Sequence, residues 1–334
     1  MSVVTALGII GAGGWGTALA ITQARAQRPV RLWVYENDLA AEMARTRENA
    51  VYLPGVQIPD NVQICNSLRD AAVGAETLIL AVPSQFYRAV AAQLMPLVSA
   101  KTVFVSATKG IENDTLRRMS EILEEVAKPS TAQVAILSGP TFAPEVSRGE
   151  PAALVIASTD DSLRVRLQTE LSTPRFRLYT NSDRTGVELC GAVKNTIAIA
   201  AGVADGLGLG SNATAALVTR GLAEMTRLVM ACGGRRETMS GLAGLGDLVL
   251  TAYGNLSRNR RVGLELGRGR KIEDITSGMR AIAEGIRTTK STVQLAQRLG
   301  IEMPIAEKMY AVLYEGLQPQ EALTDLMERK LKEE

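Results

Sequence analysis

The sequence predicts an α/β protein in which a mostly parallel sheet domain is followed by an all-helical domain. Three observations support this fold class. Short β-branched runs alternate with amphipathic stretches in the first half, a glycine-rich turn follows the first run, and strand-like runs stop after about residue 182. The 334 residues are many for one core, so we expect domains over residues 1–182 and 183–334.

The elements expected in the first domain follow from residue periodicity. Strands are predicted at residues 6–13, 30–36, 77–84, 102–110 and 134–140, and runs at 152–158 and 176–180 extend the sheet. Amphipathic stretches at 83–98 and 115–126 are typical of helices that connect parallel strands by right-handed crossovers. The second domain is predicted to be helical, with glycine-rich breaks near 205–211, 241–246 and 267–269.

Composition excludes several classes of function. The chain has 37 basic and 35 acidic residues, a net charge of +2, so neither nucleic acid nor a membrane surface is an expected partner. No segment is expected to approach the apolar length that spans a bilayer. Three widely spaced cysteines indicate neither a metal site nor a disulfide framework and favour a reducing cytoplasm. The chain lacks histidine, so proton transfer must use another group.

A dinucleotide-binding fingerprint follows the first predicted strand. In "GIIGAGGWGTALA", Gly11 allows a tight turn, Gly13 lets the backbone approach a pyrophosphate, and Gly16 permits close packing of helix on strand. The alternative is a purely structural glycine turn. The order of strand, turn and helix favours a Rossmann-type domain that binds a dinucleotide at the helix N-terminus.

Loops after later strands are the expected positions of further ligand contacts. "SATKG" places Lys109 at the end of one strand, and "LSGPTFAPEV" places Gly139, Thr141 and Ala143 at the end of another. For Lys109 the alternative is an ordinary surface lysine. A cationic side chain at a strand's carboxyl end is nevertheless well placed to contact a phosphate.

Two isolated charges in the second half require partners. Lys194 stands alone in the apolar run "GVELCGAVKNTIAIAAG", where the ordinary alternative is a stem along the helix with its ammonium in water. Asp247 is the single carboxylate of "GLAGLGDLVLT" and could instead be a helix cap. "SRNRR", which contains Ser257, Arg258 and Asn259, is either a solvated basic face or a phosphate clamp.

These motifs together resemble a known enzyme family over nearly the whole chain. The runs "GAGGWGTALA", "YLPG", "AVPS", "TKGIE", "LSGPTFAPEV", "GLAGLGDLVLT", "SRNRRVG" and "AEGIRT", with the stretch that begins at "GVELCGAVKN", are similar to bacterial-type NAD(P)-dependent sn-glycerol-3-phosphate dehydrogenases. The resemblance implies a Rossmann domain followed by an all-helical substrate domain. It also implies reversible hydride transfer between NAD(P)H and dihydroxyacetone phosphate, which supplies sn-glycerol 3-phosphate for glycerophospholipid synthesis.

The resemblance also implies roles for individual residues. The catalytic group is Lys194 as proton carrier, with Lys109 and Asp247. The substrate contacts are Lys109, Gly139, Thr141, Lys194, Asp247, Ser257, Arg258 and Asn259. The cofactor contacts that it implies are Gly14, Trp15, Lys109, Ala143, Arg258, Ile282 and Glu284. They add to Gly11, Gly13 and Gly16 of the fingerprint and to Tyr35 and Glu36 after the second strand. No metal is implied, and a homodimer remains a further expectation.

Cofactor preference depends on the end of the second strand. Bacterial relatives that favour NADP carry a basic pair there, whereas this chain has Tyr35 and Glu36. A carboxylate at this spacing accepts hydrogen bonds from the adenosine ribose and repels the 2′-phosphate of NADP, so NAD is the expected cofactor, with NADP the alternative. The alternative requires Glu36 to face solvent while Arg45 or Arg47 receives the phosphate.

Two other functions are alternatives to this one. Relatives of 3-hydroxyacid or 6-phosphogluconate dehydrogenases share the layout and a catalytic lysine, but "LSGPTF", "GLGDLVLT" and "SRNRR" fit them less well. A cofactor-binding sensor without turnover would lack some of the polar site residues, and this sequence lacks none of them.

Overall fold

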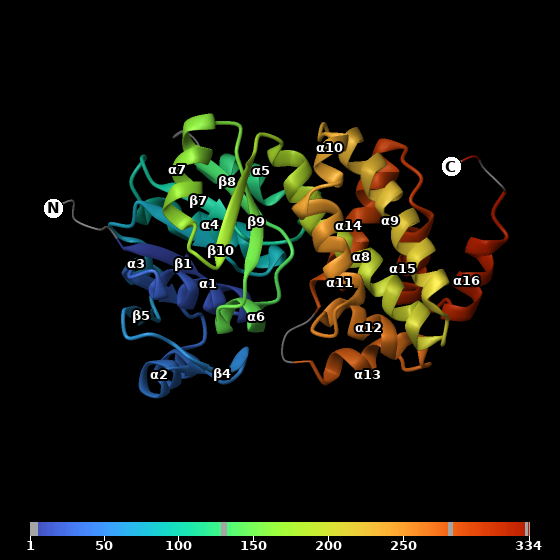
Figure 1. The fold of residues 1–334 in the computed structure, drawn as a ribbon, viewed down its shortest axis with the longest axis horizontal. Coiled ribbons are helices and arrows are strands. Elements are labelled where there is room, and N and C mark those ends of the chain that lie inside the picture. The colour runs from blue at the N-terminus through green and yellow to red at the C-terminus, as the bar shows by residue number, and fades with distance from the viewer. Residues whose placement is uncertain (1–5, 128–131, 280–282, 331–332, 334) are drawn as a thin grey trace. The chain divides into compact units, whose positions relative to one another are not determined.

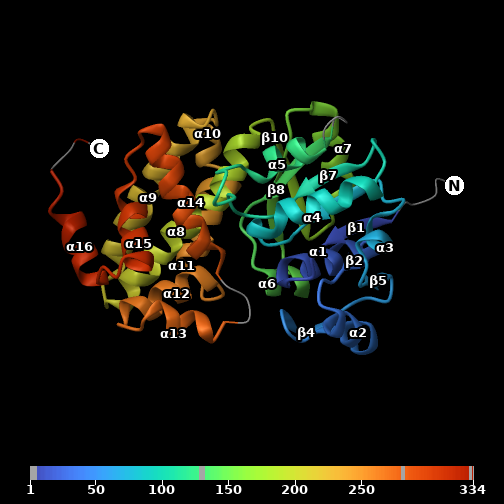
Figure 2. The ribbon, with the colours of Figure 1, turned by 180° about the vertical axis from the view of Figure 1, so that it is seen from behind.

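The computed structural model describes residues 6–127, 132–279, 283–330 and 333, and the chain divides into two compact units. Unit 1 comprises residues 1–109 and 117–188, and unit 2 comprises residues 110–116 and 189–334. Figures 1 and 2 show a sheet with helices in the first unit and only helices in the second. The Rossmann-type fold class, with a helical second part, is confirmed.

Within the described residues, unit 1 contains a sheet of eight strands in the order β10-β9-β8-β7-β6-β1-β2-β5. Its strands are β1 (Leu7–Ile10), β2 (Val30–Trp33), β5 (Val62–Cys65), β6 (Thr77–Leu80), β7 (Val103–Ser106), β8 (Gln133–Ser138), β9 (Ala152–Ala157) and β10 (Phe176–Asn181). All neighbouring pairs are parallel except β8 and β9. A separate antiparallel hairpin joins β3 (Glu48–Asn49) to β4 (Leu53–Gln57).

Helices cover both faces of this sheet. They are α1 (Gly14–Arg25), α2 (Asn37–Thr46), α3 (Leu68–Ala72), η1 (Ser84–Phe86), α4 (Tyr87–Leu94), η2 (Met95–Leu97), α5 (Met119–Val126), α6 (Ala143–Arg148) and α7 (Asp161–Leu171). One apolar core joins the sheet to α1, α2, α6 and α7, and a second joins its opposite face to α3, α4 and α5. All seven strands expected from sequence are present, whereas β3, β4 and β5 were not anticipated.

Unit 2 is built around one long helix, α8 (Arg184–Gly206), whose first residues belong to unit 1. The others are α9 (Ser211–Ala231), α10 (Arg236–Met239), the π-helical turn η3 (Leu242–Gly246), α11 (Asp247–Tyr253), α12 (Arg258–Gly267), α13 (Ile272–Ser277), α14 (Glu284–Leu299), α15 (Pro304–Tyr314) and α16 (Pro319–Met327). By length and hydropathy α8 could span a bilayer, so the expectation that no segment approaches that length was wrong. Its most apolar window is entirely buried, as in the core helix of a globular protein.

Paired glycines bring α8 and α12 into backbone contact. A Cβ at Gly202 on α8 would lie 2.0 Å from the carbonyl oxygen of Arg260, and one at Gly263 on α12 would lie 1.9 Å from that of Ile199. No side chain can occupy either position without separating the helices, because such contacts are far inside van der Waals distance. The glycines therefore fix the spacing between the helix that carries Lys194 and the helix that begins at Arg258.

Candidate active site

The glycine loop between β1 and α1 has the geometry that its sequence requires. Gly11 adopts φ +111°, and a Cβ there would lie 2.8 Å from the carbonyl oxygen of Ala81. A Cβ at Gly16 would lie 1.9 Å from the carbonyl oxygen of Gly11. These two glycines are thus needed by the turn and by the packing of α1 against it.

Gly13 differs, because a Cβ there would meet no described atom within 4 Å. The space above Gly13 is open, and no acidic residue lies in the first turn of α1 among the residues described. A helix N-terminus that presents backbone N–H groups to open space suits a pyrophosphate. The buried indole N–H of Trp15 has no hydrogen-bond partner in the described part of the chain, and it suits an acceptor on a bound cofactor.

Gly14 is the position where other predicted cofactor contacts approach the loop. A Cβ at Gly14 would lie 2.9 Å from the carbonyl oxygen of Tyr52 and 3.8 Å from the Cβ of Ala143. Ala143 is the first residue of α6, directly after the loop that follows β8. The structure thus brings Ala143 beside the glycine loop, and its contact with the dinucleotide stays a prediction.

Tyr35 and Glu36 follow β2, and both are exposed. The Tyr35 ring packs edge-on against Trp33, with ring centroids 5.9 Å apart. Glu36 precedes α2, and its Oε1 accepts a hydrogen bond of 3.0 Å from the Tyr52 hydroxyl. Arg47, an alternative phosphate partner, donates instead to the carbonyl oxygens of Ile58, Pro59 and Val62.

Three predicted substrate contacts converge at the ends of β7 and β8. The Lys109 ammonium donates to the carbonyl oxygen of Gly139 at 3.0 Å, and the Thr141 hydroxyl donates to the same oxygen at 3.3 Å. Gly139 has φ +146°, and a Cβ there would lie 2.9 Å from the Cα of Leu154. The loop after β8 therefore orients Lys109 through a backbone carbonyl that only a glycine position can present in this way.

In unit 2, the two isolated charges found in the sequence form an ion pair. Lys194 is 4% exposed and Asp247 is fully buried, and Nζ lies 2.8 Å from Oδ1. The ordinary alternatives are wrong here, because the ammonium does not extend into water and the N-cap of α11 is Gly246. The carboxylate compensates a charge that would otherwise be costly to bury.

Thr251 is a site residue that sequence reasoning missed. It lies one turn after Asp247 on α11, and its hydroxyl accepts a 2.5 Å hydrogen bond from Lys194 Nζ. The same hydroxyl donates to the backbone carbonyl oxygen of Asp247 at 2.6 Å. The signal was a threonine four residues after a buried carboxylate, the spacing that places both on one helix face.

Asn195 is the second residue that was missed. Its Oδ1 accepts a 2.9 Å hydrogen bond from Asn259 Nδ2, and the Oδ1 of Asn259 accepts one of 2.9 Å from the backbone N–H of Gly285. These bonds connect α8, α12 and α14 at positions next to the predicted site residues Lys194, Arg258 and Glu284. Its signal was a second polar residue next to Lys194 in the same apolar run.

The "SRNRR" segment begins α12. Ser257 is its N-cap and accepts from the backbone N–H of Arg260, whose guanidinium pairs with Asp205 at 2.7 Å. Arg258 makes no side-chain hydrogen bond or ion pair with any residue that the structure describes. Part of its surface is exposed, yet desolvation by the surrounding protein lowers its guanidinium pKa, and Glu284 opposes this shift. The guanidinium of Arg258 stays charged whichever of these two effects on its pKa is larger.

The remaining predicted cofactor contacts lie at the start of α14. Glu284 is the first residue of this helix and is close enough to Arg258 to raise its guanidinium pKa against the effect of desolvation. Ile282 lies outside the described residues. The predicted residues therefore form one group in unit 1 and one in unit 2.

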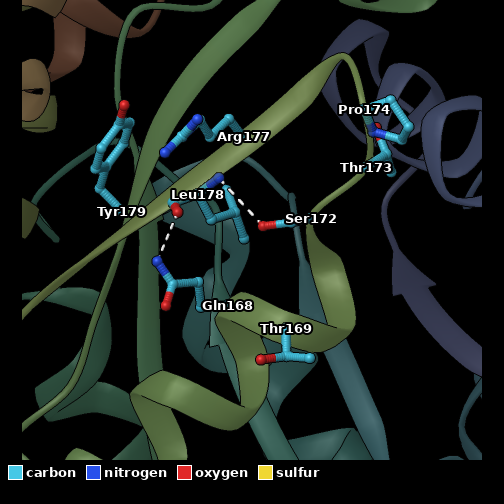
Figure 3. A pocket seen from close by; sticks show the side chains of 8 residues that line it. All are labelled: Gln168, Thr169, Ser172, Thr173, Pro174, Arg177, Leu178 and Tyr179. Carbon is cyan, nitrogen blue, oxygen red and sulfur yellow. Dashed lines mark hydrogen bonds between the residues drawn. The ribbon is translucent and has the colours of Figure 1, made fainter.

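An open pocket between α7 and β10 contains none of these residues. The Gln168 amide donates to the carbonyl oxygen of Leu178 at 2.8 Å, and the Leu178 N–H donates to Ser172 Oγ at 3.3 Å. Both bonds are drawn as dashed lines among the lining residues in Figure 3. Since β10 is the last strand of the sheet, these side chains satisfy backbone groups that an edge strand otherwise exposes. We therefore attribute the side chains of this pocket to the covering of an exposed sheet edge and not to ligand binding.

Comparisons with known proteins cover nearly the whole chain. The family model for the N-terminus of NAD-dependent glycerol-3-phosphate dehydrogenase matches residues 6–164, and the model for its C-terminus matches residues 183–324. A relative from Koribacter versatilis, named glycerol-3-phosphate dehydrogenase (NAD(P)+), is 53% identical over 326 residues, which are 97% of each chain. One with the same name from Geobacter sulfurreducens is 51% identical over 98% of each chain.

Solved structures give the same result. The crystal structure of glycerol-3-phosphate dehydrogenase from Coxiella burnetii is 43% identical, with a TM-score of 0.94 over 97% of this chain and 99% of that one. A ketopantoate reductase from Ralstonia eutropha, 17% identical with a TM-score of 0.61, shares the fold alone.

Proposed function

This chain belongs to the family of NAD-dependent glycerol-3-phosphate dehydrogenases, and from that membership we propose which of its residues perform the reaction. It is an NAD(P)-dependent oxidoreductase that reversibly converts dihydroxyacetone phosphate to sn-glycerol 3-phosphate, a precursor of glycerophospholipids. The single observation that supports the residue assignment is the buried pair of Lys194 and Asp247.

We assign the proton transfer to Lys194. Reduction of a ketone needs an acid at the carbonyl oxygen, and the reverse oxidation needs the same group as base. Asp247 and Thr251 each accept from the ammonium, so two of its three donors have fixed directions. Because the chain has no histidine, a held ammonium is a suitable proton carrier in this site.

We assign the substrate's phosphate to the start of α12. Arg258 provides a charged side chain, and the first backbone N–H groups of this ten-residue helix provide further donors. Ser257 contributes as the cap that shapes this helix end, and Asn259 through its bonds to Asn195 and Gly285. Lys109 is the substrate contact that unit 1 supplies, with Gly139 and Thr141 around it.

We assign the dinucleotide to residues 1–182 and the substrate to residues 183–334, apart from the contacts already named. The open space at Gly13, the indole of Trp15 and the N-terminus of α1 fit a pyrophosphate-bearing cofactor. When bound, NAD(H) supplies or accepts the hydride. Glu36 is proposed to accept hydrogen bonds from the adenosine ribose, which favours NAD over NADP.

A direct assay tests this proposal. We expect the purified protein to oxidise NADH in the presence of dihydroxyacetone phosphate and to reduce NAD with sn-glycerol 3-phosphate. The decisive comparison is with Lys194→Met, which should bind NADH as the unmodified protein does but reduce dihydroxyacetone phosphate at least a hundredfold more slowly. Equal turnover by both proteins would remove Lys194 from the mechanism.

We further propose a cytoplasmic homodimer. Cys65, Cys190 and Cys232 are thiols rather than members of disulfides, which suits a reducing compartment. Leu245, Val249 and Tyr253 are exposed apolar side chains at helical spacing along η3 and α11, and Leu256 is exposed in the turn after α11. A second copy of the chain would cover them. Light scattering should give twice the mass of one chain, and Val249→Asp should reduce it to that of one chain.

A further inference from the structure

The β3–β4 hairpin contains the motif "YLPG", which the proposed function does not use. Asn49 in this hairpin is fully buried, and its Nδ2 donates at 2.8 Å both to the carbonyl oxygen of Ala12 and to the hydroxyl of Thr17. Its Oδ1 accepts from the backbone N–H of Tyr52 at 3.0 Å. The turn of the hairpin is therefore fastened to the glycine loop and to the first helix after it.

Tyr52 links two parts of the proposed cofactor site. Its carbonyl oxygen would lie 2.9 Å from a Cβ at Gly14, so its backbone packs closely against the loop. Its hydroxyl, at the other end of the side chain, donates to Oε1 of Glu36 at 3.0 Å. One rigid aromatic side chain thus sets where the carboxylate of Glu36 lies relative to the glycine loop.

Neither the cap position nor the two nearby arginines considered as phosphate partners competes with Tyr52 for Glu36 among the described residues. Glu36 occupies the N-cap position of α2, yet its side chain makes no cap hydrogen bond within the described chain. Arg47 is held by three backbone carbonyls, and Arg45 is more than two helical turns away, about 13 Å along the axis. Neither arginine is therefore placed to replace Glu36 as the group nearest the ribose.

We propose that Tyr52 is a specificity-determining residue that selects NAD over NADP by holding the Glu36 carboxylate. The inference rests on the proposed contact between Glu36 and the ribose. Tyr52 occupies Oε1, which leaves Oε2 to accept from the 2′-hydroxyl of NAD. The same restraint keeps the negative charge of Glu36 from turning away when a 2′-phosphate approaches, so the repulsion of NADP persists.

The test combines Tyr52→Phe, Glu36→Gln and the double variant. Dissociation constants for NADH and NADPH are measured by nucleotide fluorescence, and kcat/KM for both is measured at one fixed concentration of dihydroxyacetone phosphate. Tyr52→Phe should lower the NADH-to-NADPH preference in both measurements by about two- to tenfold, the range of one net hydrogen bond. Tyr179→Phe is the matched control, since Tyr179 is an exposed residue of β10.

The outcomes separate this inference from the function on which it rests. In the Glu36→Gln background, Tyr52→Phe should change the preference no further, because the hydroxyl acts through the carboxylate. Equal weakening of NADH and NADPH by Tyr52→Phe would show a packing role only and would overturn the inference. If Glu36→Gln leaves the preference unchanged, the ribose contact itself is wrong; if only Tyr52→Phe leaves it unchanged, the role of Tyr52 alone is wrong.

Discussion

Replacing Lys194 by methionine should separate the catalytic and structural roles of the buried ion pair. Methionine keeps the length and apolar stem of lysine but removes the ammonium that contacts Asp247 at 2.8 Å and Thr251 at 2.5 Å. Turnover should fall by about 10² to 10⁴, the usual contribution of a positioned acid or base. NADH binding should be unchanged.

The same substitution should also reduce the free energy of unfolding. Asp247 is fully buried, so loss of its partner leaves an uncompensated carboxylate, which typically costs about 3–5 kcal/mol. Adding Asp247→Leu removes that charge at nearly constant volume. The double variant should therefore regain most of the lost stability while its turnover remains as low as that of Lys194→Met.

Two measurements test the catalytic and the structural role of the ion pair. Urea denaturation gives the free energy of unfolding of each variant, and NADH oxidation with saturating dihydroxyacetone phosphate gives kcat. Retention of more than about a tenth of the activity in Lys194→Met would place the proton carrier elsewhere. A double variant no more stable than Lys194→Met would show that the buried charge of Asp247 is not the source of the loss.

Four other changes have expected outcomes. Arg258→Ala should raise the KM for dihydroxyacetone phosphate by one to two decades, from the loss of about 1.5–3 kcal/mol, and should affect unphosphorylated dihydroxyacetone much less; an equal loss for both rejects the clamp. The kcat/KM of the unmodified enzyme should be higher for NADH than for NADPH, and Glu36→Arg should shift the ratio toward NADPH; a tenfold preference for NADPH before substitution contradicts the ribose contact. Gly263→Ala should lower the free energy of unfolding by about 2–3 kcal/mol in urea, because its Cβ would meet the carbonyl oxygen of Ile199 at 1.9 Å; unchanged stability would mean that the helices separate at little cost. Burial raises the pKa of Glu224 to about 7, so the folded state binds this proton more tightly than the unfolded state. The resulting contribution to the free energy of unfolding is fully present below pH about 4.5 and is lost as the pH rises through 7. Glu224→Gln should therefore reduce the fall in the free energy of unfolding over this pH range.

Local sequence pattern predicted the elements better than it predicted their pairing. The seven expected strands are apolar runs whose residue types favour a buried strand. Strand β5 was missed because "VQIC" is short and lies at the sheet edge, where its identity depends on pairing with β2. The antiparallel contact between β8 and β9 was also hidden, since strand direction leaves no trace in side-chain alternation.

In the candidate site, too, the sequence indicated individual residues but not the contacts between them. Sequence identified Lys194 and Asp247 separately, as buried charges that need partners, but a contact between α8 and α11 has no local signature. Thr251 was missed because a threonine in an apolar helix is usually satisfied by its own backbone, and only the lysine gives it a second contact. Residues in regular elements were therefore easier to find than the contacts between those elements.

The burial of α8 has a consequence for biosynthesis. The helix is covered by residues that follow it in the chain: Gly221 of α9 packs on Ile197, α12 contacts it through Gly263, and Thr289 of α14 shares a 3.0 Å hydrogen bond with Thr196. A ribosome therefore releases this apolar helix well before its cover has been translated. The sheet of unit 1 is complete by then, whereas the contacts of Lys194 form only after α11 has emerged, and the hydrogen bond between Thr196 and Thr289 only after α14 has emerged. The proposed proton carrier therefore acquires both partners only after the chain has been synthesised as far as Thr251, long after the sheet is complete.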